Sequence, residues 1–447
     1  MTQRAERVAV YGLGYVGKAL TAVMLRAGFE VVGVDVDEAK VEELNKGRVR
    51  YVEAKARDAL LRGLREGRFR ATTDGVAASR ECRVKLITVP VYLSPSYEPD
   101  FSSLEAAARD VGMGAMSGDL VVLESSVPPG TTLNVVRPVL EESSGLRIEE
   151  ELLLAYSPER VYIGRAVEDI EERYPKIVAG AGPRSAKAAV ELYSRVARRG
   201  VILLSSPTAA ELEKLAEGVY RDVNIALANE LARLCAALGI DYLEVRRAAN
   251  TQPYSHLHMP GVGTGGYCIP VYPHYLVYAA RRAGVELPLI ELARRVNASM
   301  PGYTAGLVDA VARELGLERP RVAVLGLAFR GGIDDTRLSP TYDLLDHLLK
   351  KGYEDVVVHD PYVERDERLS ELGIPLLRDL AEALEGRDLV VIATAHPQYG
   401  ELSLRMLKEL ARVDRLGVVD GRLLVCDWRR PPPGVVYAAV GRPLVKG

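Results

Sequence analysis

The fold is decided by the stretch Arg7-Val-Ala-Val-Tyr-Gly12-Leu-Gly14-Tyr-Val-Gly17 near the start of the chain. Arg7–Tyr11 is rich in β-forming residues and is predicted to be a strand. Lys18–Ala27 is then predicted to be a helix, and Glu30–Val34 a second strand that ends at Asp35. A strand, a Gly-x-Gly-x-x-Gly turn, a helix and a strand form the context in which such glycines bind a dinucleotide.

Each glycine of this run has its own predicted role. Gly12 makes the tight turn, Gly14 lets a pyrophosphate approach the backbone, and Gly17 lets the helix pack on the strand. The start of the helix offers N–H groups and a partial positive charge to the pyrophosphate. Asp35 lies at about the spacing, ~20 residues, of an acid that binds the ribose 2′-hydroxyl and repels a 2′-phosphate. NAD is therefore the predicted cofactor, and the alternative is a βα turn that binds nothing.

The βα pattern continues with predicted strands Val84–Val89, Leu120–Glu124 and Leu152–Tyr156. In an open α/β sheet, the loops that follow the carboxyl ends of the strands face the ligand. Glu159 follows the last of these strands and is either a general base or a surface carboxylate. Its position alone favours the surface.

A long helix is predicted over Thr208–Leu238, after the capping residues Ser205-Ser206. Beyond it, a second βαβ region without the complete fingerprint is predicted, with strands Arg321–Leu325, Val356–His359 and Leu389–Ala393. The predicted fold class is α/β, with two Rossmann-like doubly wound domains joined by a helical central domain. The predicted boundaries are 1–205 for NAD binding, 206–318 for the central domain and 319–447 for the second Rossmann-like domain.

Cys268 ends the glycine-rich run Pro260-Gly-Val-Gly-Thr-Gly-Gly-Tyr-Cys-Ile-Pro270. Glycine is costly unless the backbone needs a positive φ or a close approach, so this loop differs from an ordinary core segment. A nicotinamide cofactor and a reactive thiol together indicate oxidation of an aldehyde through a thioester. A free cysteine is more often a small buried hydrophobe, which is expected of Cys82, Cys235 and Cys426. No cysteine or histidine spacing predicts a metal site.

The composition is that of a globular protein, with 447 residues, 48 % of them hydrophobic and 27 % charged. The net charge of −3 provides no field that would attract nucleic acid or an anionic membrane. Arg281-Arg282 and Arg294-Arg295 are expected to be solvated helix faces. No apolar run reaches the roughly 18 residues of a membrane span, and the predicted first strand leaves no room for a signal peptide. A cytoplasmic location is expected.

Several segments together resemble the NAD-dependent nucleotide-sugar 6-dehydrogenases, which oxidise UDP- or GDP-sugars to uronic acids. The resemblance covers nearly the whole chain. It rests on Gly12–Gly17, Glu98–Asp100, Glu124–Thr132, Ser157–Arg160, Lys214–Glu230, Pro260–Pro270 and Phe329–Pro340.

The resemblance implies a mechanism in which NAD takes hydride from C6 of the sugar and Cys268 adds to the resulting aldehyde. A second NAD oxidises this adduct to a thioester, which water hydrolyses. It implies catalytic roles for Lys214 on the oxyanion, for Glu159 in proton transfer, and for Ser126 where the family usually has a threonine. Implied cofactor contacts are Gly12, Leu13, Gly14, Tyr15, Val16, Gly17, Asp35, Pro90 and Ser126. Implied substrate contacts are Glu159, Arg160, Lys214, Gly218, Arg221, Asn224, Gly263, Gly265, Gly266, Tyr267, Phe329, Arg330 and Arg337. The long helix is implied to form a homodimer interface.

Val271 stands where the UDP-glucose and GDP-mannose branches carry a lysine, so the chain is most similar to the UDP-N-acetylmannosamine branch. Four positions depart from the family pattern. The family usually has asparagine at Gly218, aspartate at Tyr272, histidine at Tyr267 and an arginine near Tyr254. These changes leave two alternatives open beside a UDP-N-acetylhexosamine dehydrogenase: a UDP-glucose 6-dehydrogenase, and a catalytically impaired nucleotide-sugar-binding homologue.

Overall fold

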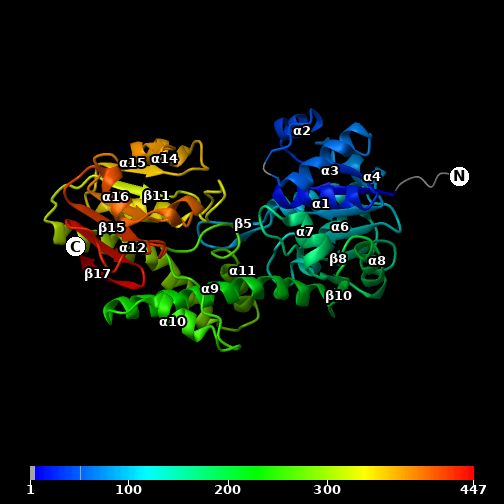
Figure 1. Cartoon of the computed structure of the whole chain (residues 1–447). Coiled ribbons are helices and arrows are strands. Elements are labelled where there is room, and N and C mark those ends of the chain that lie inside the picture. The colour runs from blue at the N-terminus through cyan, green and yellow to red at the C-terminus, as the bar shows by residue number, and fades with distance from the viewer. Residues whose placement is uncertain (1–5, 51) are drawn as a thin grey trace. The chain divides into compact units, whose positions relative to one another are not determined.

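The computed structural model describes residues 6–50 and 52–447. The chain forms two compact units (Figure 1). The first unit holds the chain up to Glu217 together with His274–Val285, and the second holds Gly218–Pro273 together with Glu286–Gly447. Helices α9 (Pro207–Ala237) and α11 (Tyr272–Arg282) contribute residues to both units.

The first unit is built on an eight-stranded sheet with the order β10-β9-β8-β7-β4-β1-β2-β3. Its strands pair in parallel except at β8 and β9. The bounds are β1 (Arg7–Tyr11), β2 (Glu30–Val34), β3 (Phe69–Thr72), β4 (Val84–Ile87), β7 (Leu120–Leu123), β8 (Leu153–Tyr156), β9 (Lys176–Gly180) and β10 (Val201–Leu203). A separate hairpin joins β5 (Tyr92–Leu93) and β6 (Pro99–Asp100).

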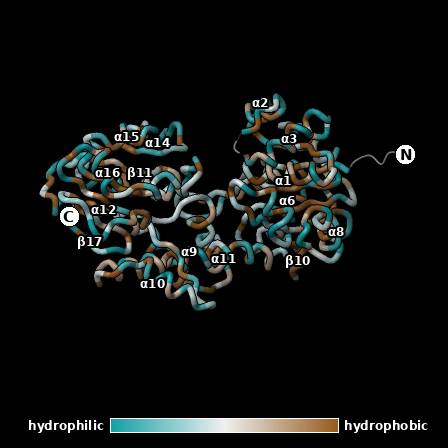
Figure 2. The backbone as a smooth tube through the Cα atoms, viewed as in Figure 1, coloured by the Kyte–Doolittle hydropathy of each residue, from teal (hydrophilic) through white to brown (hydrophobic). Residues whose placement is uncertain are grey.

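Helices cover both faces of this sheet, which buries its apolar strands on both sides (Figure 2). One face carries α1, α3 and α8, whose core residues include Leu20, Leu60 and Leu192. The helices are α1 (Tyr15–Arg26), α2 (Glu38–Asn45), α3 (Ala54–Arg65), α4 (Gly75–Glu81), α5 (Ser102–Gly114), α6 (Arg137–Ser144), α7 (Ala166–Glu168) and α8 (Pro183–Ser194). Two π-helical turns lie at Thr132–Val136 and Asp169–Arg173.

The first helix begins three residues earlier than the sequence predicted. Glycines in the fingerprint suggested a start at Lys18, but α1 starts at Tyr15 with Gly14 as its N-cap. The first N–H groups of a helix have no partner within the helix, so the fingerprint residues themselves supply these donors.

The second unit contains a seven-stranded sheet with the order β13-β12-β11-β14-β15-β16-β17, parallel except for the last pair. Its strands are β11 (Val322–Leu325), β12 (Val356–His359), β13 (Leu376–Leu377), β14 (Leu389–Ile392), β15 (Leu416–Asp420), β16 (Val435–Ala439) and β17 (Arg442–Lys446). Its helices are α10 (Tyr242–Ala249), α12 (Pro288–Leu315), α13 (Pro340–Lys350), α14 (Glu367–Glu371), α15 (Leu380–Leu384) and α16 (Leu404–Ala411), with a 3₁₀ turn at Pro397–Glu401.

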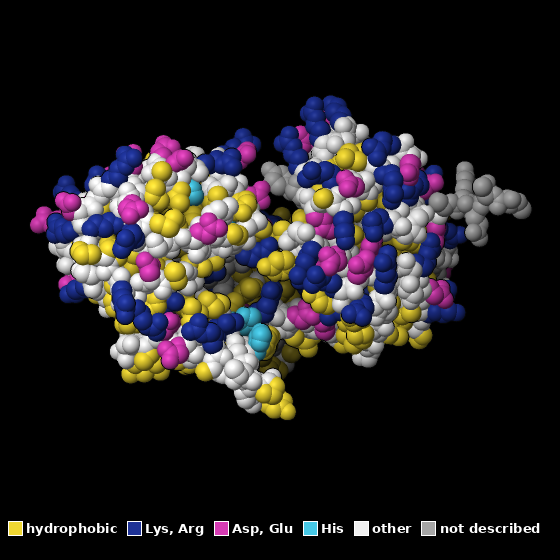
Figure 3. Space-filling view, viewed as in Figure 1, with side chains coloured by type: hydrophobic (Ala, Val, Ile, Leu, Met, Phe, Trp, Pro, Cys, Tyr) yellow, Lys and Arg dark blue, Asp and Glu magenta, His cyan; other side chains and the backbone are white. Residues whose placement is uncertain are grey.

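These elements confirm the predicted fold class: two doubly wound α/β sheets and a helical central region with one long helix. On the drawn face, basic and acidic side chains are interspersed over both units (Figure 3). Within the described ranges, no helix is long and apolar enough to cross a membrane.

Candidate active site

The predicted site residues fall into two groups, one in each unit. In the first unit, the loops after β1, β4, β7 and β8 leave the same edge of the sheet, because these neighbouring strands are parallel. The fingerprint, Pro90, Ser126 and Glu159 lie in these loops. Pro90 is exposed and Ser126 is half-buried. The sheet thus brings together the first group of predicted residues at its ligand-facing edge.

The glycine fingerprint closes as a tight turn. Gly12 has φ of +92°, and a Cβ on Gly17 would lie 1.8 Å from the carbonyl oxygen of Gly12, so a side chain at Gly17 is excluded. A Cβ on Gly14 would meet nothing within 4 Å, which leaves open space beside the N-terminus of α1. Asp35 accepts a hydrogen bond from the N–H of Leu13 at 2.8 Å, and its carboxylate pairs with Lys40 at 2.9 Å.

Glu159 is buried, so its interpretation as a surface carboxylate is wrong. Its Oε1 lies 2.6 Å from the Nζ atom of Lys176, which also lies 2.8 Å from Oε2 of Glu124. Tyr193 donates its hydroxyl to the other Glu124 oxygen. Burial raises the pKa of Glu124 to about 8, and Lys176 opposes this shift. The ammonium group of Lys176 therefore holds Glu159 in place at the end of β8.

Two other candidates, Arg160 and Lys214, also belong to the first unit. Arg160 pairs with Glu217 at 3.2 Å, and its guanidinium stacks over the ring of Tyr174. Lys214 is half-buried on α9. Sequence reasoning missed Glu211, which is fully buried and accepts hydrogen bonds from the N–H groups of Gly130 and Thr132. Glu211 anchors the loop that carries Ser126 to α9, and its only sequence signal is a carboxylate on a buried helix face.

In the second unit, the two glycine-containing motifs pack against each other. A Cβ on Gly265 would lie 2.6 Å from Cβ of Phe329, and a Cβ on Gly266 would lie 2.8 Å from its ring. The N–H of Gly266 donates to the carbonyl of Arg337 at 2.9 Å. Gly263 has φ of +149°, and its Cβ would lie 2.8 Å from Pro340. These glycines let the loop before Cys268 lie directly on the segment 329–340.

Cys268 is free and exposed, as expected of a reactive thiol. Its sulfur accepts a hydrogen bond from the hydroxyl of Tyr272 at 3.3 Å. The guanidinium of Arg337 lies 5.6 Å from the ring centre of Tyr267 and pairs with Asp335. Arg330 is half-buried in the same segment. The second unit thus brings the thiol, Tyr267, Phe329 and Arg337 into one neighbourhood.

Three residues predicted to bind substrate, Gly218, Arg221 and Asn224, lie on α9 in the second unit. Arg221 is exposed. Asn224 binds protein backbone, since its amide donates to the carbonyl of His256 and accepts from the N–H of His258, both at 2.9 Å.

Comparison with known families settles the classification. Models described as "UDP-glucose/GDP-mannose dehydrogenase family", for its NAD binding, central and UDP binding domains, match residues 6–197, 208–299 and 323–426. The chain belongs to this family. It is an NAD-dependent nucleotide-sugar dehydrogenase.

Relatives resemble this dehydrogenase over almost its full length. A UDP-N-acetyl-D-mannosamine dehydrogenase of Pyrococcus horikoshii is 35 % identical, with 98 % of this chain and 99 % of the relative covered. A solved structure of a UDP-D-ManNAc dehydrogenase from Pyrococcus horikoshii has a TM-score of 0.88 at 34 % identity, covering 98 % and 99 % of the two chains. A UDP-glucose dehydrogenase structure from Pyrobaculum islandicum has a TM-score of 0.87 at 31 % identity, covering 99 % of each chain.

The residues of the dehydrogenase's first Rossmann-like sheet fit NAD. The open space at Gly14 adjoins the N-terminus of α1, the kind of helix end that suits a pyrophosphate, and Asp35 directly follows β2, the position of a ribose-binding acid. Sequence reasoning missed Thr88, whose hydroxyl donates to the carbonyl of Gly12 at 2.7 Å and braces the turn. Thr88 directly follows β4, which ends at Ile87, whereas the sequence predicted a strand that continued to Val89.

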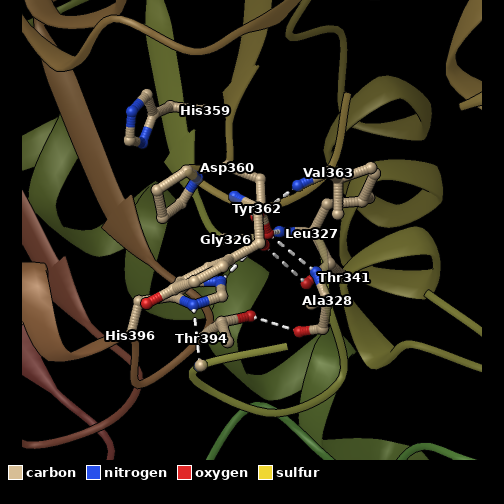
Figure 4. Close-up of polar contacts among 12 residues, drawn as sticks. Gly326, Leu327, Ala328, Thr341, His359, Asp360, Tyr362, Val363, Thr394 and His396 are labelled. Atoms are coloured by element: carbon tan, nitrogen blue, oxygen red, sulfur yellow. Dashed lines mark hydrogen bonds and ion pairs between the residues drawn. The ribbon is translucent and has the colours of Figure 1, made fainter. Parts of the chain in front are cut away.

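In the UDP binding domain of the dehydrogenase, Asp360 holds the position after the second strand that Asp35 holds in the first sheet, but its carboxylate is enclosed by protein (Figure 4). Asp360 follows β12, is fully buried, and accepts hydrogen bonds from the N–H groups of Leu327 and Ala328 at 2.8 and 2.9 Å. His396 lies 3.0 Å from the same carboxylate. Burial opposes ionisation, but hydrogen bonds from His396 and Ala328 lower the pKa of Asp360 to about 2. This acid closes its own βα turn, which agrees with the incomplete fingerprint of the second region.

A buried polar network of the dehydrogenase, absent from the predictions, supports the start of the Cys268 loop. Asn229 accepts from the N–H of Gly261 at 2.9 Å and donates to Asn297. Asp222 pairs with Arg294 at 3.1 Å, and Arg294 also donates to Thr264 of the loop. The expectation that Arg294 belongs to a solvated face is therefore wrong.

All three other cysteines of the dehydrogenase were predicted to be buried, and the structure confirms this for two of them. Cys82 and Cys235 are buried as expected, and burial raises the pKa of the Cys82 thiol to about 12. Cys426 is exposed, so its expected burial is wrong. It follows the buried Val425 but its own side chain reaches the surface.

Proposed function

We propose that this dehydrogenase oxidises a UDP-N-acetylhexosamine, with UDP-N-acetyl-D-mannosamine as the preferred substrate, at C6 to the uronic acid in a four-electron reaction. The observation that carries the proposal is the exposed Cys268 thiol, at the end of a loop packed on Phe329. Phe329 belongs to the segment matched by the UDP binding domain. Val271 and the names of the Pyrococcus relatives support the N-acetylmannosamine substrate.

In the proposed mechanism, Cys268 adds to the C6 aldehyde and keeps that carbon covalently attached through the second oxidation. Bound NAD supplies the hydride acceptor for both oxidations. Lys214 stabilises the negative charge on the C6 oxygen, and Arg330 and Arg337 hold the UDP moiety. Glu159 moves the proton of the water that hydrolyses the thioester, and Ser126 holds that water near C6.

One assay tests the proposal and its rivals. The enzyme is incubated with NAD and, separately, with UDP-N-acetylmannosamine, UDP-N-acetylglucosamine and UDP-glucose, and NADH is counted per sugar consumed. Two NADH with UDP-N-acetylmannosamine are expected. Two NADH with UDP-glucose alone would instead identify a UDP-glucose 6-dehydrogenase. The similarity to the Pyrobaculum structure is the observation that favours this second candidate. Tight UDP-sugar binding without NADH would identify an impaired homologue.

We also propose that the residues 1–205, 206–318 and 319–447 act as NAD-binding, central and UDP-sugar-binding domains, and that the chain forms a homodimer through α9. The helix exposes apolar side chains in its second-unit portion, Leu227 at 46 % and Leu234 at 53 %, and Leu238, just after its last residue, is 63 % exposed. Leu227 and Leu234 are seven residues apart and therefore lie on one helix face. An apolar face of this kind supports association with a second copy.

A further inference from the structure

Gly218 and Tyr272, two of the four departures from the family pattern, are in contact. A Cβ built on Gly218 would lie 2.4 Å from Cδ2 and 3.1 Å from Cε2 of the Tyr272 ring. Gly218 lies inside α9 with ordinary helical backbone, a position where glycine is disfavoured relative to alanine. The absence of a side chain at Gly218 is therefore explained by the Tyr272 ring, which occupies the space that a Cβ would need.

The same tyrosine holds Cys268 at two points. Its hydroxyl donates to the sulfur at 3.3 Å, and its N–H donates to the carbonyl of Cys268 at 2.9 Å. Tyr272 itself is buried, whereas the thiol is exposed. A ring fixed by packing thus orients a sulfur atom that remains open to a substrate.

We propose that Gly218 and Tyr272 form a matched pair, in which Gly218 provides the space for the ring and Tyr272 is a catalytic residue whose phenol holds the reacting sulfur of Cys268. This inference rests on the proposed function. The pair replaces the asparagine and aspartate that the family usually has at these two positions. The two departures depend on each other, because any side chain at Gly218 collides with the ring.

The chemistry that Tyr272 supports is the addition of the thiolate to the C6 aldehyde. The sulfur forms a bond to C6, the π electron pair of the carbonyl moves to its oxygen, and that oxygen takes a proton from water. Before the attack the phenol O–H stabilises the negative charge on the sulfur and fixes its direction. Hydrogen bonds to a charged group are stronger than those between neutral groups, so the bond from the phenol is strongest when the sulfur carries its negative charge.

Tyr272→Phe keeps the ring over Gly218 and removes only the hydroxyl. In single turnovers with NAD and UDP-N-acetylmannosamine, the first NADH is expected within about twofold of the wild-type rate, while the second slows by about 10- to 100-fold. A second NADH at the wild-type rate would overturn the proposal. If the wild-type enzyme itself released no NADH with any UDP-sugar, the proposed function would fail, and the pairing would be judged by stability alone.

The stability test uses Gly218→Ala, Tyr272→Ala and the double variant, with thermal unfolding as the readout. Gly218→Ala is expected to lower the melting temperature by at least a few degrees beside Tyr272, and to have no such effect beside Ala at position 272, because the collision is then absent. Gly306→Ala in α12 is the matched control, since its Cβ would meet nothing within 4 Å. Additive effects of the two substitutions would show that the residues are not a matched pair.

Discussion

The ammonium nitrogen of Lys176 lies 2.6 Å from Oε1 of Glu159, and both side chains are buried. The same nitrogen lies 2.8 Å from Glu124, so one cation contacts two buried carboxyl groups. Charges removed from water are tolerated when they are paired and hydrogen-bonded. Lys176 therefore connects the stability of the first unit to the position of its proposed proton-transfer residue.

Lys176→Met is expected to cost about 3–5 kcal/mol of unfolding free energy, because it removes the cation that contacts the buried carboxyl groups of Glu124 and Glu159. Urea unfolding measures the loss. Lys187→Met removes an ammonium group that is 80 % exposed and serves as the matched control, with little change expected. Equal unfolding midpoints for the two variants would contradict the structural role of Lys176.

Substitutions at two fingerprint glycines are expected to distinguish an effect on folding from an effect on NAD binding. Gly17→Ala places a Cβ 1.8 Å from the Gly12 carbonyl oxygen, so it should distort the turn, lower stability and abolish NAD binding. Gly14→Ala meets nothing within 4 Å and should fold normally, while its methyl group enters the space of the pyrophosphate and weakens NAD binding at least about tenfold. Calorimetric titration with NAD and thermal unfolding give the two readouts. Unchanged NAD affinity in Gly14→Ala would place the pyrophosphate elsewhere.

The strands could be predicted because local patterns decide them. Arg7–Tyr11, Glu30–Val34 and Val356–His359 are short β-branched runs bounded by turn residues, and each forms a strand with the predicted bounds. The start of α1 was predicted too late because glycine is a poor helix former, whereas Gly14 here serves as an N-cap and Gly17 is required by contact with Gly12.

The partners of the candidate site residues could not be predicted, because they come from distant parts of the chain. The burial of Glu159 depends on Lys176, which belongs to β9, and the pairing of Arg294 depends on Asp222 in α9. The contact of Gly218 with Tyr272 likewise joins two helices. Residue types at the motifs indicated the chemistry, but tertiary packing determines what each side chain touches.

The unfolding free energy of the second unit should decrease at acid pH, because Asp360 becomes protonated there. Its pKa is lowered from 3.8 to about 2 in the folded state, so its contribution is fully present above the ordinary pKa and is lost as the pH falls through 4 towards 2. Asp360→Asn should cost about 2 kcal/mol at pH 7, and this difference from wild type should narrow between pH 4 and pH 3. Urea midpoints at these pH values measure it. Asp414→Asn, an exposed site in the same unit, is the control, and a constant difference for Asp360→Asn would refute the linkage.

The exposed leucines of α9 should control association of the chain. Leu227→Glu combined with Leu234→Glu places two carboxylates on the proposed interface and should convert a dimer to a monomer in light scattering at micromolar concentration. Leu289→Glu changes a leucine that is 64 % exposed on α12 and serves as the control. A wild-type chain that is monomeric throughout would contradict the proposed dimer.

Cys268 and Cys426 are both free and exposed, so a substitution at Cys426 is a suitable control for a test of the thioester mechanism at Cys268. Cys268→Ser should slow the aldehyde-to-acid step by about 1,000-fold or more, because an alkoxide is harder to form than a thiolate and an ester hydrolyses less readily than a thioester. The first oxidation should continue, so the ratio of NADH to sugar falls from two towards one, or an intermediate is trapped. Cys426→Ser should keep the ratio at two. Full four-electron turnover by Cys268→Ser would mean that no covalent sulfur intermediate is required, and what remained would be an alcohol dehydrogenase on the same fold.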